Sequence, residues 1–327
     1  MGRLFTVSIP LIASFCAAYA VADEVEDAIP RSLRYLEKGA IDWKDTMGCA
    51  SCHHAPMMLW TCATAKRQGY EVDNASVETI AKYLLSEDNA AKILPPENPP
   101  PERDGTQLGS TYALLALEQS GAARADAAVV KRIRDHFIAT QREDGTWPPF
   151  PSMGRSPILE GIAVSARMLT LALADLPEGA AIPAVVQKAY AALATPIENP
   201  SHQVRVLQLL VDVRSDAPHD VIDAQVNALE SLQRPDGSWA QTPEMSGDAY
   251  ATGQTLYALG KAGKRADNPV VRRAVAFLLS TQQPEGSWPM TSRPMAEGDS
   301  GSTNLEPITF AATAWAILGI LAVTESP

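Results

Sequence analysis

The chain has 327 residues, enough for one large domain or two, and 46% of them are hydrophobic. Its formal net charge is −11, with 38 acidic against 27 basic residues, and this charge would repel a phosphate backbone. We therefore expect no nucleic-acid partner. A negative surface could steer a basic redox partner, but acidic surfaces are also common among soluble proteins.

The first 22 residues have the features of a cleaved export signal. Arg3 precedes an apolar stretch over residues 4–18, and small residues near position 20 supply cleavage sites. No later stretch is long and apolar enough to predict a spanning helix. We therefore predict a signal peptide over residues 1–22 and a periplasmic or secreted mature protein, residues 23–327, that does not span the membrane.

Residues 49–53 read Cys-Ala-Ser-Cys-His, the spacing by which a c-type haem is attached covalently. Cys49 and Cys52 can each form a thioether to the porphyrin, and His53 can reach the iron from one face. Attachment of this cofactor is completed outside the cytoplasm, which agrees with an export signal. The motif predicts haem c as the cofactor, with His53 as an iron ligand.

A Cys-x-x-Cys pair can also form a disulfide or half of a zinc site. Cys62 is the remaining cysteine outside the signal. If a helix begins at Pro56, Cys62 lies about 9 Å further along the axis, too far to share one metal easily. Its apolar surroundings are more typical of a buried thiol. We rank haem first, a disulfide second and zinc third.

The second axial ligand is not specified by the motif. Met57, Met58 and His202 offer thioether or imidazole groups. A His/Met pair would favour electron transfer, whereas an empty position would permit binding of a small molecule. The spacing does not choose between these alternatives.

A seven-residue pattern, Gln-x-x-acid-Gly-x-Trp, occurs at residues 141–147, 233–239 and 282–288. The last two copies are 49 positions apart and the first two are 92 apart, nearly double, which implies a degenerate copy between them. Each copy follows an amphipathic helical stretch, and its glycine can adopt the positive φ that ends a helix. We expect the tryptophan to fold back over the helix and its N–H to form a hydrogen bond.

Helical stretches alternate between half-polar and nearly all-apolar along the chain. This alternation is expected when one ring of helices surrounds another, because the inner ring is buried on both sides. The half-polar helices should begin near residues 28, 76, 125, 182, 219 and 268. The apolar helices should cover residues 54–69, 108–120, 158–173, 201–213, 249–261 and 307–323.

The three Gln-to-Trp copies resemble the repeat of squalene-hopene cyclases and oxidosqualene cyclases. The helix pairing resembles the wider α/α-toroid group, which includes prenyltransferase β subunits. The resemblance implies an all-α fold, an α6-α6 barrel of six helix pairs forming one domain over residues 23–327, with a central cavity for an apolar small molecule. The Cys-x-x-Cys-His segment has no counterpart in hopene synthesis.

The catalytic motif of those cyclases is absent. Class II cyclases protonate an alkene with an Asp-x-Asp-Asp cluster, and this chain has only Asp248 at the corresponding place. An N-cap role for Asp248 is the simpler interpretation. Glu160 and Glu306 also begin apolar helices and are candidates for a general acid and base, although solvated rim positions are more common.

Three functions fit these features. In the first, an exported c-type haem protein transfers electrons or oxidises an apolar guest, with the haem capping the barrel near the starts of the apolar helices. In the second, the barrel is an isoprenoid cyclase, isomerase or lyase that needs no cofactor. In the third, it is a non-catalytic binding scaffold whose Cys-x-x-Cys pair forms a disulfide.

Overall fold

The computed structural model describes residues 11–48, 53–94, 107–122, 128–148, 156–158, 161–174, 183–293 and 303–325. Within these ranges the regular structure is helical, apart from two isolated β-bridges that pair Ser156 with Arg293 and Trp239 with Asp248. The cysteines of the predicted haem motif, Cys49 and Cys52, lie outside the described residues, and so does Glu160.

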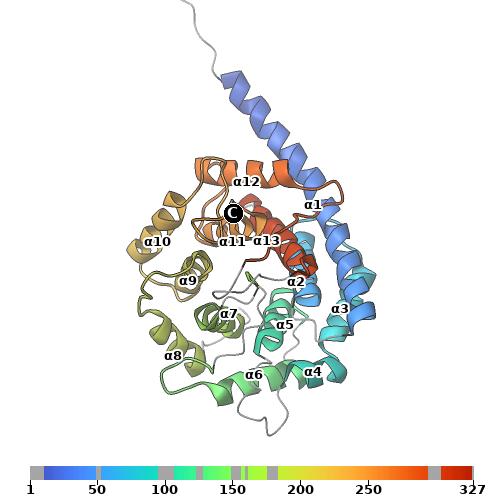
Figure 1. Ribbon diagram of the computed structural model, residues 1–327, viewed down its shortest axis with the longest axis vertical. Coiled ribbons are helices and arrows are strands. Elements are labelled where there is room, and N and C mark those ends of the chain that lie inside the picture. Colours follow the sequence, from blue (N-terminus) through green and yellow to red (C-terminus); the bar gives the residue numbers. More distant parts are fainter. Residues whose placement is uncertain are drawn as a thin grey trace, which may run out of the picture.

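The helices form two concentric rings around a common axis (Figure 1). The inner ring consists of α2 (His54–Arg67), α5 (Gln107–Gln119), α7 (Ile162–Ala174), α9 (His202–Arg214), α11 (Ala249–Lys261) and α13 (Glu306–Thr324). The outer ring consists of α1 (Leu11–Met47), α3 (Asn74–Leu84), α4 (Glu87–Ile93), α6 (Ala128–Thr140), α8 (Ala184–Leu193), α10 (His219–Ser231) and α12 (Pro269–Thr281). The predicted all-α toroid of helix pairs is confirmed.

Burial follows the predicted alternation. On the outer helix α12 the buried residues are Val271, Ala274, Val275 and Leu278, which form one stripe. Inner helix α13 is buried along nearly its whole length. It is long and apolar enough to cross a membrane by length and composition, but 89% of the relevant window is buried inside the protein.

Two outer elements differ from the predicted helices. The second outer position is divided into α3 and α4, because Ser86 accepts a hydrogen bond from the Asn89 N–H and starts a new helix. Helix α1 extends beyond the barrel toward the N-terminus (Figure 1), and Val25 is the first buried side chain described on it. The signal peptide boundary at residue 22 stays a prediction.

Each Gln-to-Trp copy joins two neighbouring outer helices. The glutamine amide donates to a backbone carbonyl of the next outer helix, and the tryptophan N–H donates back to a carbonyl of its own helix. The glutamine bonds are Gln141 to Val185 (2.8 Å), Gln233 to Val270 (2.8 Å) and Gln282 to Ala28 (3.0 Å); the tryptophan bonds are Trp147 to Phe137 (2.8 Å), Trp239 to Leu229 (2.8 Å) and Trp288 to Leu278 (2.9 Å).

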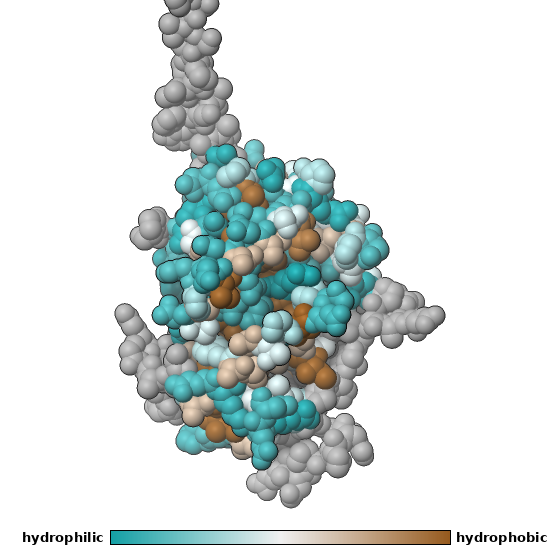
Figure 2. Space-filling view, turned by 90° about the vertical axis from the view of Figure 1, so that its left-hand side faces the viewer, coloured by the Kyte–Doolittle hydropathy of each residue, from teal (hydrophilic) through white to brown (hydrophobic). Residues whose placement is uncertain are grey.

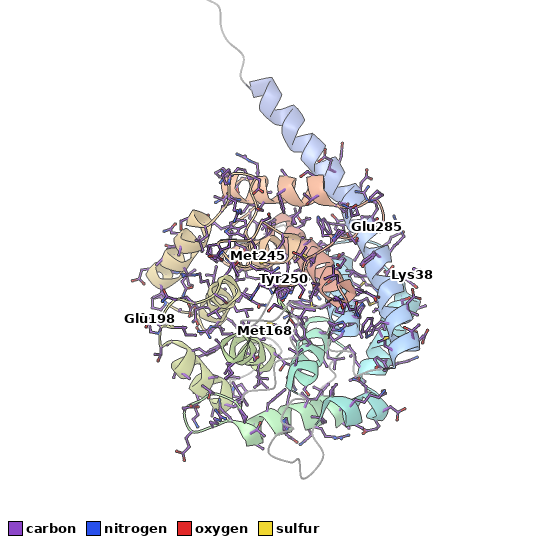
Figure 3. The ribbon with its side chains drawn as sticks, viewed as in Figure 1. Lys38, Met168, Glu198, Met245, Tyr250 and Glu285 are labelled. Atoms are coloured by element: carbon purple, nitrogen blue, oxygen red, sulfur yellow. The ribbon has the colours of Figure 1, made fainter. Side chains whose placement is uncertain are left out.

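The glycine of each copy is required by both conformation and space. Gly237 has a φ of +90°, and a Cβ there would lie 2.4 Å from the Arg273 carbonyl oxygen. Gly286 has a φ of +97° and would meet the Arg31 backbone at 2.5 Å. The third copy therefore packs against α1, and Glu285 beside α1 marks this contact in Figure 3. Because α12 is joined to α1 in this way, the ring is closed.

Candidate functional site

A cavity of about 460 Å³ lies along the axis of the barrel and is lined by side chains from all six inner helices. Met168 lies on the axis side of α7 (Figure 3). Inner helices α11 and α13 run parallel, since Gly253 packs on Trp315 while Gly260 packs on Ala322 further along both helices. The lining is Trp60, Leu115, Gln119, Met168, Leu171, Leu207, Leu210, Val213, Arg214, Tyr257, Lys261 and Trp315, so the cavity extends from the middle of the helices to their C-terminal ends.

Three aromatic rings form one wall of this cavity. Trp60 packs edge-to-face on Tyr257 at 5.5 Å and on Trp315 at 5.2 Å, and Tyr257 lies 5.7 Å from Trp315. Edge-to-face contacts of this kind fix the orientation of each ring. The wall is held in place by close packing of α11 on α13, where a Cβ at Gly253 would lie 2.4 Å from the Trp315 backbone.

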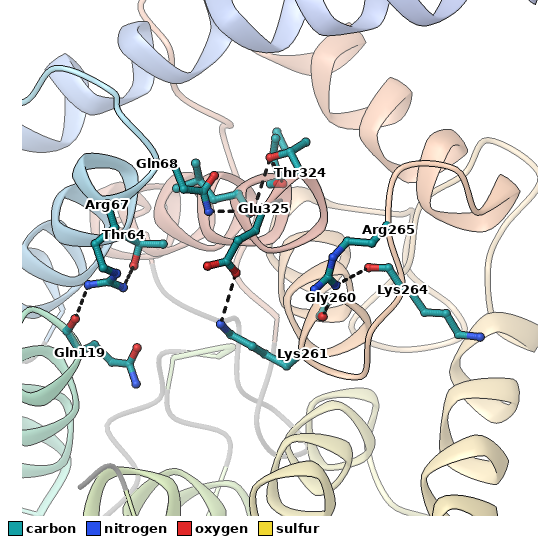
Figure 4. A network of polar contacts seen from close by, with 12 residues as sticks. Thr64, Arg67, Gln68, Gln119, Gly260, Lys261, Lys264, Arg265, Thr324 and Glu325 are labelled. Carbon is teal, nitrogen blue, oxygen red and sulfur yellow. Dashed lines mark hydrogen bonds and ion pairs between the residues drawn. The ribbon is translucent and has the colours of Figure 1, made fainter. Parts of the chain in front are cut away.

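The charged groups of the cavity lining are basic and stand at the C-terminal mouth. Lys261 lies 4.0 Å from Glu325 and over the Tyr257 ring, with Nζ 5.4 Å from its centroid. At the same mouth Arg67 donates to the Gln119 carbonyl (Figure 4). Basic side chains stabilise the partial negative charge of helix C-termini. No carboxylate occurs in the lining formed by the described residues.

Asp248 occupies the opposite, N-terminal end of α11. Its Oδ1 accepts a hydrogen bond from the Ala251 N–H at 2.8 Å, and its Oδ2 accepts one from Gln241 at 3.1 Å. The first of these bonds is the N-cap that the sequence predicts. Burial raises the pKa of Asp248 to about 6, although both hydrogen bonds favour the charged form. Asp248 does not belong to the lining of the central cavity, and its catalytic role stays a prediction.

Glu306 also stands at an inner-helix start, at the first position of α13. Its side chain is 57% exposed, and its Oε1 lies 3.9 Å from His54 Nε2. That exposure agrees with a rim position. Glu160 lies outside the described residues, and the catalytic roles of Glu160, Asp248 and Glu306 stay predictions.

His53 and His54 form a buried pair at the start of α2. Their Nδ1 atoms are 2.5 Å apart, so one of them donates to the other. Trp43 stacks on His54 at 4.2 Å and meets His53 edge-on at 5.0 Å. Burial, followed by the charge of His53, lowers the pKa of His54 to about 2, which keeps His54 neutral.

This pair fits a haem-binding histidine. A ligating imidazole is normally oriented by a hydrogen bond at its other nitrogen, and His54 supplies such a partner to Nδ1 of His53. Iron would then be coordinated through Nε2 of His53. Haem c would supply redox chemistry or ligand binding at its iron. The cofactor itself stays a prediction, because the residues that would attach it lie outside the described ranges.

The candidate second ligands lie at different places. Met57 and Met58 are buried in α2, with Met57 one turn beyond His53, so a single helix would have to supply both faces of the haem. His202 is on α9, which faces α2 across the ring (Figure 1), and its Nε2 is 2.8 Å from Thr255 Oγ1. Burial lowers the pKa of His202 to about 4. The sixth ligand stays a prediction.

Cys62 is a fully buried free thiol, as expected from its apolar surroundings. Its Sγ lies 3.9 Å from Glu37 Oε1, and burial raises its pKa well above the usual value. No cluster of three or more His, Cys, Asp or Glu side chains suited to a metal ion occurs among the residues that the structure describes.

The lining residues of the cavity were not singled out by sequence reasoning. Trp60, Tyr257 and Trp315 sit in helices whose apolar residues all look alike, because an inner helix is hydrophobic on every side. A signal was present in the aromatic residues themselves, since bulky rings at the middle of three inner helices can meet at the axis.

The comparisons with known proteins agree with this architecture. The model of the squalene-hopene cyclase C-terminal domain matches residues 184–327. No curated protein matches the chain by sequence. Among solved structures, a variant of the type II terpene cyclase MstE from Scytonema in complex with geranylgeranyl dihydroxybenzoate aligns with a TM-score of 0.62 at 14% identity, covering 93% of this chain and 99% of that one.

Two sugar-acting enzymes share the same architecture. A polysaccharide lyase aligns with a TM-score of 0.60 at 12% identity, covering 93% of this chain and 97% of that one. A glycosidase in complex with glucose aligns with a TM-score of 0.58 at 12% identity, covering 91% of this chain and 98% of that one. At these identities the likeness establishes the fold. The protein is a cyclase-like α/α toroid, a class that hosts unrelated reactions.

Proposed function

We propose that the protein binds an isoprenoid-like apolar molecule in its central cavity and acts on it by cyclase, isomerase or lyase chemistry that protein side chains can perform. The observation that carries this proposal is the wall formed by Trp60, Tyr257 and Trp315 in a cavity lined from all six inner helices. Its volume is within the range of small-molecule sites.

The chemistry of the wall supports this class of guest. Aromatic faces attract cations, and isoprenoid rearrangements pass through carbocations, so such a wall can stabilise the reacting carbon skeleton. The aliphatic lining of Leu207, Leu210 and Met168 excludes water that would quench a cation. The MstE structure contains a geranylgeranyl compound, which supports an isoprenoid chain as the first guest to try.

The proposed chemistry also needs a proton donor. Among the described carboxyls, Asp248 combines a place at an inner-helix start with a pKa of about 6, a value suited to a general acid near neutral pH. Asp248 is outside the lining of the central cavity, so a guest would have to extend from that cavity to the N-terminal end of α11 to reach it. The hydrogen bonds of Asp248 are those of an N-cap. Asp248→Asn retains a side-chain oxygen for capping and removes the transferable proton, so it separates the two roles.

The test measures binding and turnover separately. Binding of geranylgeranyl dihydroxybenzoate and of geranylgeraniol is followed by quenching of tryptophan fluorescence, and products are sought by mass spectrometry and NMR. Met168→Trp should fill the cavity and reduce affinity at least tenfold. Ile138→Trp, on the exposed face of α6, is the matched control and should bind normally. Failure of the wild-type protein to bind either compound, or equal binding by Met168→Trp, would overturn the proposal.

The turnover measurement tests whether the protein is an enzyme and whether Asp248 is its general acid. Conversion that is lost in Asp248→Asn while binding is retained would assign the acid role to Asp248. Binding without conversion by the wild-type protein would favour the non-catalytic scaffold instead.

A second candidate function is a c-type haem protein for electron transfer or oxidation of an apolar guest. The specific observation in its favour is the orientation of His53 by His54. It predicts covalent haem in protein exported by a host that matures c-type cytochromes. A pyridine haemochrome spectrum and the intact mass test it, and a mass equal to the processed polypeptide alone would contradict it.

A further inference from the structure

The turn that follows α8 lacks the motif that joins α6 to α8, α10 to α12 and α12 to α1. The turn after α8, residues 194–201, contains neither glutamine, glycine nor tryptophan. It is the degenerate copy that the spacing of the three intact copies implies. Glu198 marks this turn at the edge of the barrel in Figure 3. No tryptophan is therefore available from this turn to fill the junction between α8 and α10.

A cavity of about 480 Å³ is present at this junction. It is lined by the end of α8, the following turn, the first turns of α10 and the facing sides of α7 and α9. Ala166, Leu193 and Val211 form a small hydrophobic cluster here that is separate from the main core. The tryptophans of the three intact copies are buried, whereas the turn after α8 supplies no ring to this junction.

The apolar part of the cavity reaches the surface. Ile197 and Val221 line it and are 39% and 40% exposed, which is unusual for large aliphatic residues in this chain. Figure 2 views the side of the barrel that carries α8 and α10, where hydrophobic residues lie among polar ones. A ligand can therefore enter from solvent without opening the barrel.

A charged group stands at the inner end of the cavity. Arg167 is 2% exposed and donates from Nε to Gln208 Oε1 and from Nη1 to the Ala163 carbonyl, both at 2.9 Å. Neither of these bonds uses Nη2, and the charge of Asp212 also acts on the guanidinium. A buried guanidinium with a donor to spare is suited to an anionic oxygen.

A second hydrogen-bond donor in the lining of this cavity lacks a partner in the described part of the chain. The Tyr190 hydroxyl is buried and makes no hydrogen bond in the described structure, although Tyr190 lines the cavity. Leaving such a group unpaired lowers stability, and a ligand oxygen could offset that loss.

The remaining charges in the lining favour a single negative charge on the ligand. Asp212 is the carboxylate of the lining, and its two oxygens accept hydrogen bonds from Gln208 (2.9 Å) and Gln225 (2.5 Å). Arg205 adds a second positive charge to that of Arg167. Two arginines against one aspartate leave one positive charge for a ligand to balance.

We propose that this cavity between α7, α8, α9 and α10 binds a small monocarboxylate with a planar apolar body. The ring occupies the apolar space that tryptophan fills at the intact junctions, and the carboxylate accepts hydrogen bonds from Arg167 and the Tyr190 hydroxyl. This site is distinct from the central cavity and does not depend on the function proposed there.

Indole-3-acetate is the probe, because it joins an indole ring to one carboxylate. Its binding to the full mature chain is measured by calorimetry beside indole and acetate, each of which should bind at least tenfold more weakly. Binding of indole as tight as that of indole-3-acetate would show that the carboxylate is not recognised and would overturn the proposal.

Substitutions locate the site. Val221→Trp should fill the cavity and abolish binding, whereas the exposed Leu232→Trp and the central-cavity variant Met168→Trp should bind as the wild type does. Loss of binding in Met168→Trp, or normal binding in Val221→Trp, would overturn the assignment.

Tyr190→Phe keeps the test informative if variants of the buried Arg167 fail to fold. Removing an unpaired buried hydroxyl should raise the melting temperature of the free protein while weakening the binding of indole-3-acetate about fivefold to tenfold. Unchanged affinity in Tyr190→Phe would remove the hydroxyl from the site and contradict the proposal.

Discussion

The side chain of Gln282 donates from Nε2 to the backbone carbonyl of Ala28 at 3.0 Å, and this bond joins the last outer helix to the first. The same amide lies 2.8 Å from Ser32 Oγ, which in turn donates to the Gly286 carbonyl at 2.6 Å. The corresponding glutamines Gln141 and Gln233 join helices that are close in sequence. Gln282 alone among the three closes the ring.

Gln282→Leu should therefore destabilise the protein, because the substitution removes the hydrogen bonds that the Gln282 amide donates to the Ala28 carbonyl and to Ser32 Oγ. We expect a loss of about 1–3 kcal/mol in the free energy of unfolding. Urea denaturation measures this loss. Hydrogen exchange should show in addition that α1 opens more readily than in Gln141→Leu, the matched control at a junction that does not close the ring. Equal protection of α1 in both variants would contradict the closing role.

The sequence was sufficient to predict the ring, because its repeats encode both contacts that build it. The glutamine and the glycine of each copy contact the next outer helix. The tryptophan of each copy forms a hydrogen bond with the outer helix that precedes it. The alternation of half-polar and apolar stretches then assigned helices to the two rings.

The cavity wall could not be predicted in the same way. An inner helix is apolar on every side, and its packing against two neighbouring helices decides which face is turned to the axis. Trp60 and Trp315 therefore could not be distinguished from core residues in the sequence. The His53–His54 contact was also missed. Adjacent residues in a regular helix point apart, but His53 is the N-cap of α2 and has non-helical dihedral angles, φ −140° and ψ −50°.

Gly253→Ala should destabilise the barrel by about 1–3 kcal/mol, because the new methyl group would lie 2.4 Å from the Trp315 backbone and α11 would have to move away from α13. Thermal unfolding measures the effect. Gly39→Ala in α1 is the control, since its Cβ would meet only the edge of the Phe310 ring at 3.0 Å. A greater loss in Gly39→Ala than in Gly253→Ala would show that the α11–α13 contact tolerates expansion.

Thiol labelling separates the interpretations of the Cys49–Cys52 pair. Cys62 is buried and its pKa is raised, so it should react very slowly with a thiol reagent in the native protein and readily in the denatured protein. If Cys49 and Cys52 form a disulfide, they become reactive after reduction. If both are thioethers to haem, Cys62 remains the reactive cysteine of residues 23–327 even after reduction. Rapid labelling of Cys62 in the native state would contradict its burial.

Asp248 should make the protein less stable as the pH rises from about 4 to about 6. Burial raises the pKa of the folded carboxyl from 3.8 to about 6, so the folded protein binds this proton more tightly than the unfolded chain does. The free energy of unfolding then falls across that window and levels off above it. Asp212 and Glu37, whose pKa values are also raised by burial, contribute slopes of the same sign.

The contribution of Asp248 is isolated by Asp248→Asn, which can still cap α11 but does not titrate. Urea denaturation of both proteins at intervals from pH 4 to pH 7 should give a steeper decline for the wild type, and the difference between the two curves should be centred between pH 4 and pH 6. Parallel curves would mean that the carboxyl titrates alike in the folded and unfolded chains. In that case Asp248 would be ionised at neutral pH and unsuited to donate a proton to a guest in the barrel.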